Sequence, residues 1–166
     1  MKETTVIRVA MVCAMVGMGL SLYIQLIESG FDAPGCRINS WIDCHKVLEY
    51  KQFTGIIFGI PNQIVALCGF SLVFTLGFLR LRFPDLPHSD KIIFVMTGLN
   101  TFGACLGTYL QTISVTVIHY VCPFCVSAYT CDLISLTFES TFLIGMYRKY
   151  LERKKGEGDK ESPTSS

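Results

Sequence analysis

The chain has 166 residues, of which 51% are hydrophobic and 16% are charged, and its mean hydropathy is +0.46. This composition is too apolar for a soluble domain of this size, so it predicts an integral membrane protein. The formal net charge is only +1, and the basic residues lie near the ends of apolar runs, so the sequence carries no nucleic-acid-binding signature.

Four apolar runs follow one another, each near or above the ~20 residues that a helix needs to cross a bilayer. They cover about residues 9–27, 54–79, 92–118 and 123–147. We therefore expect an all-α integral membrane protein, with a four-transmembrane-helix bundle over residues 1–150 and a short extracytoplasmic loop that contains a half-helix. The first run exceeds the apolar core of a secretory signal and no cleavage site follows it, so we interpret it as a retained helix. Residues 151–166 are charged and predict a disordered cytoplasmic tail.

The basic residues are divided unevenly between the two sides that four crossings would create. One side has only Arg37, Lys46 and Lys51. The other side holds the remaining basic residues, which are Lys2, Arg8, Arg80, Arg82, Lys91, Arg148, Lys149, Arg153, Lys154, Lys155 and Lys160. By the positive-inside rule both termini are cytoplasmic. The membrane would be the plasma membrane in a prokaryote or the endoplasmic reticulum membrane in a eukaryote.

The first outer loop, about residues 29–53, carries the cysteine pair Cys36 and Cys44. Residues 43–53 mix polar and apolar side chains in a way that favours a short amphipathic helix on the membrane surface. Within the second apolar run, Pro61 predicts a kink in the spanning helix.

A Cys-Pro-Phe-Cys motif, Cys122 to Cys125, opens the fourth apolar run. Unpaired backbone N–H groups and the positive end of the helix dipole can lower the pKa of a thiol at a helix start. Pro123 suits the first turn, where its missing N–H costs nothing. Both cysteine pairs would face the oxidising side of the membrane, so the sequence predicts transfer of electron pairs by thiol–disulfide exchange.

Other uses of the cysteines stay open. A structural disulfide between Cys36 and Cys44 fits the cysteine count about as well as a redox role does. A zinc site is disfavoured because only one pair has the x-x spacing, and covalent haem is disfavoured because Val126 follows Cys125. The remaining cysteines lie inside apolar runs, where we expect small hydrophobes: Cys13, Cys68, Cys105 and Cys131.

Polar residues inside the apolar runs predict a buried site. Asp132 and Glu139 are seven residues apart and share a helix face, either for proton transfer or as acids satisfied by interior hydroxyls. Tyr129 follows Cys125 by one helical turn. An apolar pocket beside the Cys125 sulfur is therefore expected, and the second run would contribute its i, i+3, i+7 set, Gly55, Phe58 and Asn62.

The order of these parts resembles the vitamin K epoxide reductase family, including its bacterial and archaeal disulfide-forming homologues, over about residues 6–147. The resemblance rests on four apolar runs, a loop pair spaced Cys-x7-Cys, and a Cys-x-x-Cys motif followed by Tyr129. Smaller matches are Val47-Leu48 after the loop pair, Phe58 to Pro61 in the second run, and Tyr109-Leu110 before the motif.

The resemblance implies a quinone-coupled thiol–disulfide oxidoreductase without a metal. Its quinone would be ubiquinone, menaquinone or vitamin K, including the epoxide, and its electron donor would be a separate thioredoxin-like redox protein. Cys36 would exchange with that partner, Cys44 would pass electrons to Cys122, and Cys125 would reduce the quinone. The implied pocket has Tyr129 as the hydrogen-bond donor to a quinone carbonyl and, as apolar walls, Phe58 and Leu110.

The chain departs from the family pattern at two positions. Tyr50 stands where a loop serine is usual, and Gly55 stands where the vertebrate enzymes have a pocket asparagine. Asn62 could supply the missing hydrogen-bond donor to the quinone. Three other functions are open. The first is a quinone-coupled oxidase of the kind that carries its Cys-x-x-Cys in the first outer loop, which is disfavoured because the motif here lies at the start of the fourth run. The others are a non-enzymatic four-span protein with structural disulfides and a metal transporter or sensor.

Overall fold

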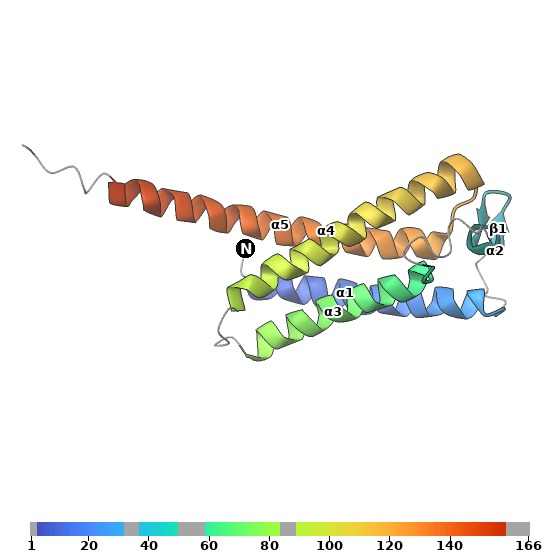
Figure 1. Ribbon diagram of the computed structural model, residues 1–166, viewed down its shortest axis with the longest axis horizontal. Helices are drawn as coiled ribbons and strands as arrows, with labels where there is room; N and C mark the ends of the chain where they lie inside the picture. The colour runs from blue at the N-terminus through green and yellow to red at the C-terminus, as the bar shows by residue number, and fades with distance from the viewer. Residues whose placement is uncertain (1–2, 32–36, 50–58, 84–88, 159–166) are drawn as a thin grey trace, which may run out of the picture.

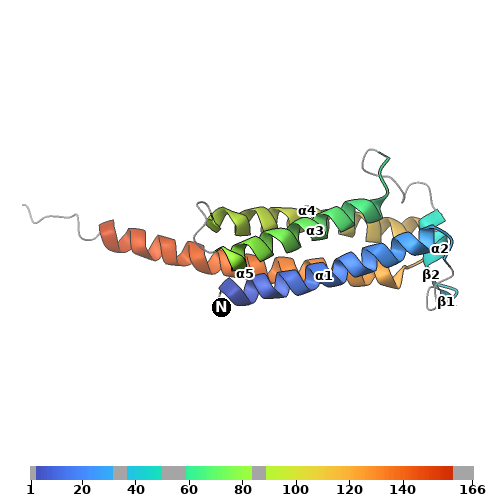
Figure 2. The same ribbon diagram turned by 90° about the horizontal axis from the view of Figure 1, so that it is seen from below.

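The computed structural model describes residues 3–31, 37–49, 59–83 and 89–158. Four long helices run side by side as a bundle (Figures 1 and 2). They are α1 (Glu3–Glu28), α3 (Asn62–Arg82), α4 (Ser89–Ile113) and α5 (Pro123–Gly158). Helices α3 and α5 both pack against α1, and α4 packs against α3 and α5. The predicted all-α class is confirmed.

Three of the described helices are long and apolar enough to cross a membrane. These are Glu3–Glu28, Asn62–Arg82 and Lys91–Ile118, the last combining most of α4 with the π-helix η1 (Ser114–Ile118). Helix α5 has sufficient length but is less apolar, because it contains two acidic residues in its middle and a charged C-terminal part. Large apolar side chains such as Leu22, Phe78 and Phe94 are exposed on the outside of the bundle, as expected where lipid surrounds a protein. The chain is an integral membrane protein.

A small cap of structure covers one end of the bundle. Strand β1 (Arg37–Asn39) pairs antiparallel with β2 (Ile42–Asp43), and α2 (Cys44–Glu49) follows directly. Asn39 closes the turn, because its Oδ1 accepts hydrogen bonds from the backbone N–H groups of Trp41 and Ile42 at 2.9 and 3.0 Å. The backbone N–H of Val121 donates to Trp41 O at 2.9 Å. This bond attaches the cap to the segment that leads into α5.

The short helix expected in the outer loop is present as α2, although residues 50–53 of that prediction lie outside the described residues. The prediction of a kink inside the second span was wrong. Helix α3 begins at Asn62, after Gly59 in a left-handed conformation (φ 76°) and Pro61 in an extended one (φ −54°, ψ 132°). Proline lacks an N–H donor, so it is accommodated best where a helix starts. Gly55 and Phe58 lie outside the described residues.

Helix α5 is longer than the fourth apolar run. It begins at Pro123, as expected for a proline in a first turn, and continues to Gly158. Residues 151–158 therefore extend the helix where the sequence suggested a disordered tail, since residues 151–155 are all good helix formers. Residues 159–166 lie outside the described part of the chain.

Two glycines on α4 allow α5 to approach closely. Gly103 and Gly107 lie one turn apart, in the small-xxx-small spacing typical of membrane helix pairs. A Cβ atom on Gly107 would lie 2.6 Å from Cδ2 of Tyr129, and one on Gly103 would lie 2.9 Å from Oδ2 of Asp132. This α4–α5 seam therefore fixes the positions of Tyr129 and Asp132 inside the bundle.

We expect Gly107→Ala to lower the free energy of unfolding by about 1–3 kcal/mol, because the added methyl overlaps the Tyr129 ring and forces the seam apart. Gly98→Ala on the same helix is the matched control, since a Cβ there meets nothing within 4 Å. It should leave stability unchanged or raise it by up to about 1 kcal/mol. Thermal unfolding in detergent measures both variants, and equal midpoints would contradict the close seam.

Candidate active site

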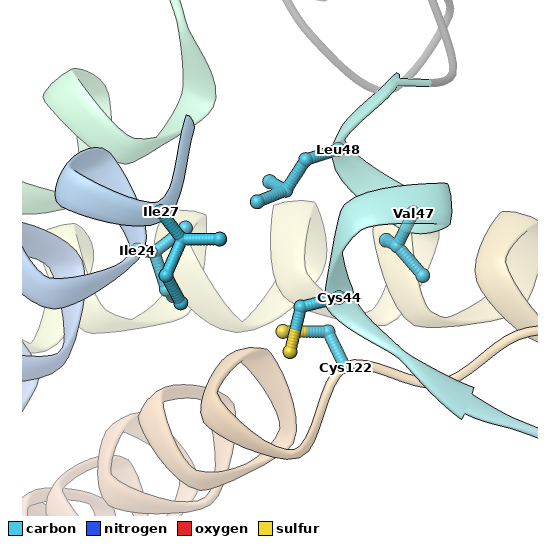
Figure 3. Packing of buried hydrophobic residues seen from close by; sticks show 6 residues of the cluster. All are labelled: Ile24, Ile27, Cys44, Val47, Leu48 and Cys122. Atoms are coloured by element: carbon cyan, nitrogen blue, oxygen red, sulfur yellow. The ribbon is translucent and has the colours of Figure 1, made fainter. Parts of the chain in front are cut away.

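Two of the predicted redox cysteines, Cys44 and Cys122, lie against each other beneath the cap. Cys44 is the first residue of α2, and Cys122 immediately precedes α5. Their sulfur atoms lie next to each other in Figure 3, and the two residues are 0% and 1% exposed. Exchange of a disulfide between the loop and the Cys-x-x-Cys motif needs this contact.

Apolar side chains enclose the sulfur pair. Ile24 and Ile27 from the last turns of α1, together with Val47 and Leu48 of α2, form one buried cluster with both cysteines (Figure 3). The partly buried side chains around this cluster are Tyr23, Leu110, Ile118, Tyr120, Phe124 and Cys125. Packing of this kind keeps bulk water away from the sulfur atoms.

Hydrogen bonds hold Cys122 as a thiolate. They lower the pKa of Cys122 from 9.0 to about 4, with the thiol of Cys125 contributing most and the thiol of Cys44 next. The backbone N–H groups of Cys125 and Phe124, at the start of α5, also donate to the sulfur, while burial acts in the opposite direction. A thiolate of low pKa leaves readily in disulfide exchange. Cys122 is therefore the sulfur best prepared to exchange with the loop.

Contacts between α2 and the segment before α5 keep the cap over Cys122. The Lys46 ammonium donates to the Tyr120 hydroxyl at 2.7 Å and lies 4.4 Å from the centre of that ring. Asp43 Oδ1 accepts a hydrogen bond from the Lys46 backbone N–H at 3.3 Å, which caps the first turn of α2. The sequence did not indicate the Lys46–Tyr120 pair, because the two residues are far apart in the chain and follow no shared pattern.

A cavity of about 360 Å³ lies beside the motif, lined mainly by α3, α4 and α5 and also by Ser21 and Ile24 of α1 and Leu48 of α2. Its walls are mainly apolar, and its size suits a small ligand. The predicted site residues that line it are Cys125, Tyr129, Leu110 and Asn62. The other two predicted site residues, Cys36 and Phe58, lie outside the described residues.

Polar groups are few in this cavity, and the sequence analysis missed some of them. The hydroxyl groups of Tyr129 and Thr108 share a hydrogen bond of 2.8 Å. Gln63, in the first turn of α3, and Gln111, near the end of α4, also line the wall. A polar residue within an apolar run was the available signal for both glutamines. The assignment to a common cavity requires the packing of α3 against α4.

We expect the reduced protein to titrate a thiolate with a midpoint near pH 4, measured by ultraviolet absorbance as the pH falls from 9.0, with Cys122→Ser as the baseline. Cys125→Ala should raise the midpoint, because it removes the largest contribution to the lowered pKa. Cys105→Ala, at an exposed position of α4, is the control that should leave it unchanged.

The lowered pKa of Cys122 also makes the stability of the reduced protein depend on pH. Because the pKa of folded Cys122 is lowered, its thiolate stabilises the reduced fold fully above pH 9.0, and this contribution is lost as the pH falls through about 4. A midpoint near 9.0 in the intact protein would contradict the hydrogen-bonded thiolate.

Comparison with known protein families adds independent information. The model of the vitamin K epoxide reductase family matches residues 8–140, which is more than half of the chain. The matched region extends from α1 into α5 and includes Cys44, Cys122 and the cavity between α3, α4 and α5. A search among individual curated proteins gave no match. The chain belongs to the vitamin K epoxide reductase family, whose general activity is quinone-linked disulfide oxidoreduction.

Proposed function

We propose that this protein passes electron pairs from a thioredoxin-like partner through Cys36 and Cys44 to Cys122 and Cys125, and then to a membrane quinone. One observation supports this path above others. Cys44 and Cys122 are buried sulfur against sulfur, and Cys125 lines the adjacent apolar cavity. A cysteine of the loop and a cavity are thus both in contact with the same motif.

The transfer begins with two dithiol–disulfide exchanges. A dithiol of the partner reduces the Cys36–Cys44 disulfide through a mixed disulfide with Cys36, and the partner becomes oxidised. Cys44 then attacks the sulfur of Cys122, the Cys122–Cys125 bond breaks, and Cys36 displaces Cys122 to restore the loop disulfide. The motif now holds the electron pair, with Cys122 as the thiolate and Cys125 as its hydrogen-bonded thiol.

The pair then passes to the substrate quinone in the cavity. Cys125 supplies the reducing sulfur, and Cys122 closes the motif disulfide as the quinol is released. The Thr108 hydroxyl donates to Ala104 O at 2.7 Å and accepts from the Tyr129 hydroxyl at 2.8 Å. When a quinone binds, the Tyr129 hydroxyl would turn from Thr108 and donate to a quinone carbonyl. Leu110 supplies apolar wall and Asn62 a further polar group at the cap end of the cavity. Ubiquinone, menaquinone and vitamin K fit this description equally well.

We also propose that α5 is a fourth membrane span and that both termini are cytoplasmic. Helix α5 packs along α1 and α4, and the two acidic side chains in its middle, Asp132 and Glu139, are buried in the bundle, not turned towards lipid. The start of α1 and the end of α5 lie at the end of the bundle opposite the cap (Figure 1). At this same end Arg80 donates to Glu3 at 2.7 Å. The basic ends of the helices then face the cytoplasm and the cysteines face the oxidising side.

Quinone absorbance tests the proposal on the full chain in detergent, with a short-chain ubiquinone as acceptor and either a small dithiol or a reduced thioredoxin-like protein as donor. Cys122→Ala and Cys125→Ala should lower turnover about 100-fold or more with both donors, because each removes half of the reducing dithiol. Cys36→Ala and Cys44→Ala should lose turnover mainly when the protein is the donor. Cys105→Ala is the control that should keep wild-type turnover.

A wild-type protein that reduces no quinone, and whose disulfides resist mild reductant, would contradict the proposal. That result would favour a non-enzymatic membrane protein with structural disulfides.

A further inference from the structure

Asp132 is a buried carboxyl in the wall of the cavity. It lies three residues after Tyr129 on α5, so the two side chains are neighbours on one helix face. The residue is 5% exposed, and its Oδ2 has no hydrogen-bond partner among the residues that the structure describes. An ionised carboxylate without partners is costly inside a membrane, whereas a neutral carboxyl carries a proton that it can donate.

The α4–α5 seam provides the space that this carboxyl occupies. Gly103 of α4 also lines the cavity, and a Cβ atom there would lie 2.9 Å from Asp132 Oδ2. Absence of a side chain at position 103 therefore lets the carboxyl sit between the two helices at the cavity wall. A larger residue would displace it from this place.

Glu139, on the same helix, provides a contrast. It is 1% exposed, but it does not line the cavity. Its Oε1 accepts hydrogen bonds from Asn100 at 3.0 Å and from Ser135 at 3.4 Å, and Asn100 also donates to Ser135 at 2.8 Å. These bonds tie α4 to α5. Of the two buried carboxyls on α5, Asp132 is the one that lines the cavity.

The proposed quinone reduction needs a proton source in that space. Reduction by two electrons takes up two protons, and the motif supplies only one, because Cys125 is a thiol while Cys122 is already a thiolate. The apolar cluster around the sulfur pair separates it from bulk water. Ser21 also lines the cavity, but its hydroxyl donates to Gly17 O at 2.9 Å. Asp132 is the carboxyl in the wall that can supply the second proton.

We propose that Asp132 is a catalytic proton donor to the substrate quinone, an inference that rests on the proposed function. Cys122 and Cys125 are oxidised to their disulfide, and the quinone is reduced to the quinol by the electron pair that they release. The S–H bond of Cys125 and the O–H bond of Asp132 break, and the two O–H bonds of the quinol form. Asp132 regains its proton from water that enters the cavity after the quinol leaves.

Steady-state quinone reduction by the full chain, with a small dithiol as donor, tests this role. Asp132→Asn keeps the size and polarity of the side chain but removes the carboxyl proton. We expect kcat to fall about 100-fold while KM for the quinone stays within about twofold. Asp132→Ser should show the same fall, and Asp132→Glu should recover part of the lost kcat. Glu139→Gln is the matched control and should keep the wild-type kcat.

Thiol labelling of the motif after exposure to the donor separates this inference from the proposed function. Labelling should proceed at the wild-type rate in Asp132→Asn and Asp132→Ser, since only the quinone step needs the carboxyl. A wild-type kcat in either variant, or a raised KM with unchanged kcat, would overturn the assignment while the oxidoreductase activity stands. Absence of quinone reduction in the wild type would instead remove the proposed function itself.

Discussion

The contact between Cys44 and the thiolate of Cys122 is the interaction on which the rest of the site depends. A buried charge is costly, and here two thiols and the backbone N–H groups at the start of α5 offset that cost. The hydrogen bond from Cys44 to Cys122 requires the cap to lie directly on the end of the bundle. The Val121–Trp41 hydrogen bond and the Lys46–Tyr120 contact hold the cap in this position. Cys44 of the cap and Cys122 of the motif therefore meet within one buried apolar cluster.

The bundle beneath the cap is shaped around a cavity. Glycines on α4 bring α5 close and fix the Tyr129 ring, while α3 and α4 leave room beside Cys125. In the proposed function, a quinone would enter this space from the membrane, and a protein partner would approach the cap. The motif is the element that these two proposed sites share, because Cys122 contacts Cys44 of the cap and Cys125 lines the cavity.

Local patterns in the sequence predicted what is local in the structure. Apolar runs located the four long helices, and the proline rule located the start of α5 at Pro123. The kink predicted at Pro61 was wrong because a proline suits a helix start as well as a kink. The turn at Gly59 determines that the helix starts after Pro61. The position of Gln63 in the cavity wall and the role of Gly107 could not be predicted from the sequence, since both depend on how neighbouring helices pack. The resemblance to a known family supplied the wall position proposed for Leu110, whereas the helical spacing in the second run already predicted Asn62 as a pocket residue.

Disulfide trapping tests the central contact most directly. A variant with both Cys36→Ala and Cys125→Ala keeps Cys44 and Cys122 but removes their partners in exchange. After mild oxidation and proteolysis, mass spectrometry should find Cys44 linked to Cys122 in nearly all molecules, because the sulfur atoms already lie together (Figure 3). If both thiols remain reduced, or if Cys122 is linked instead to another cysteine such as Cys68, the account of electron transfer from the loop to the motif is wrong.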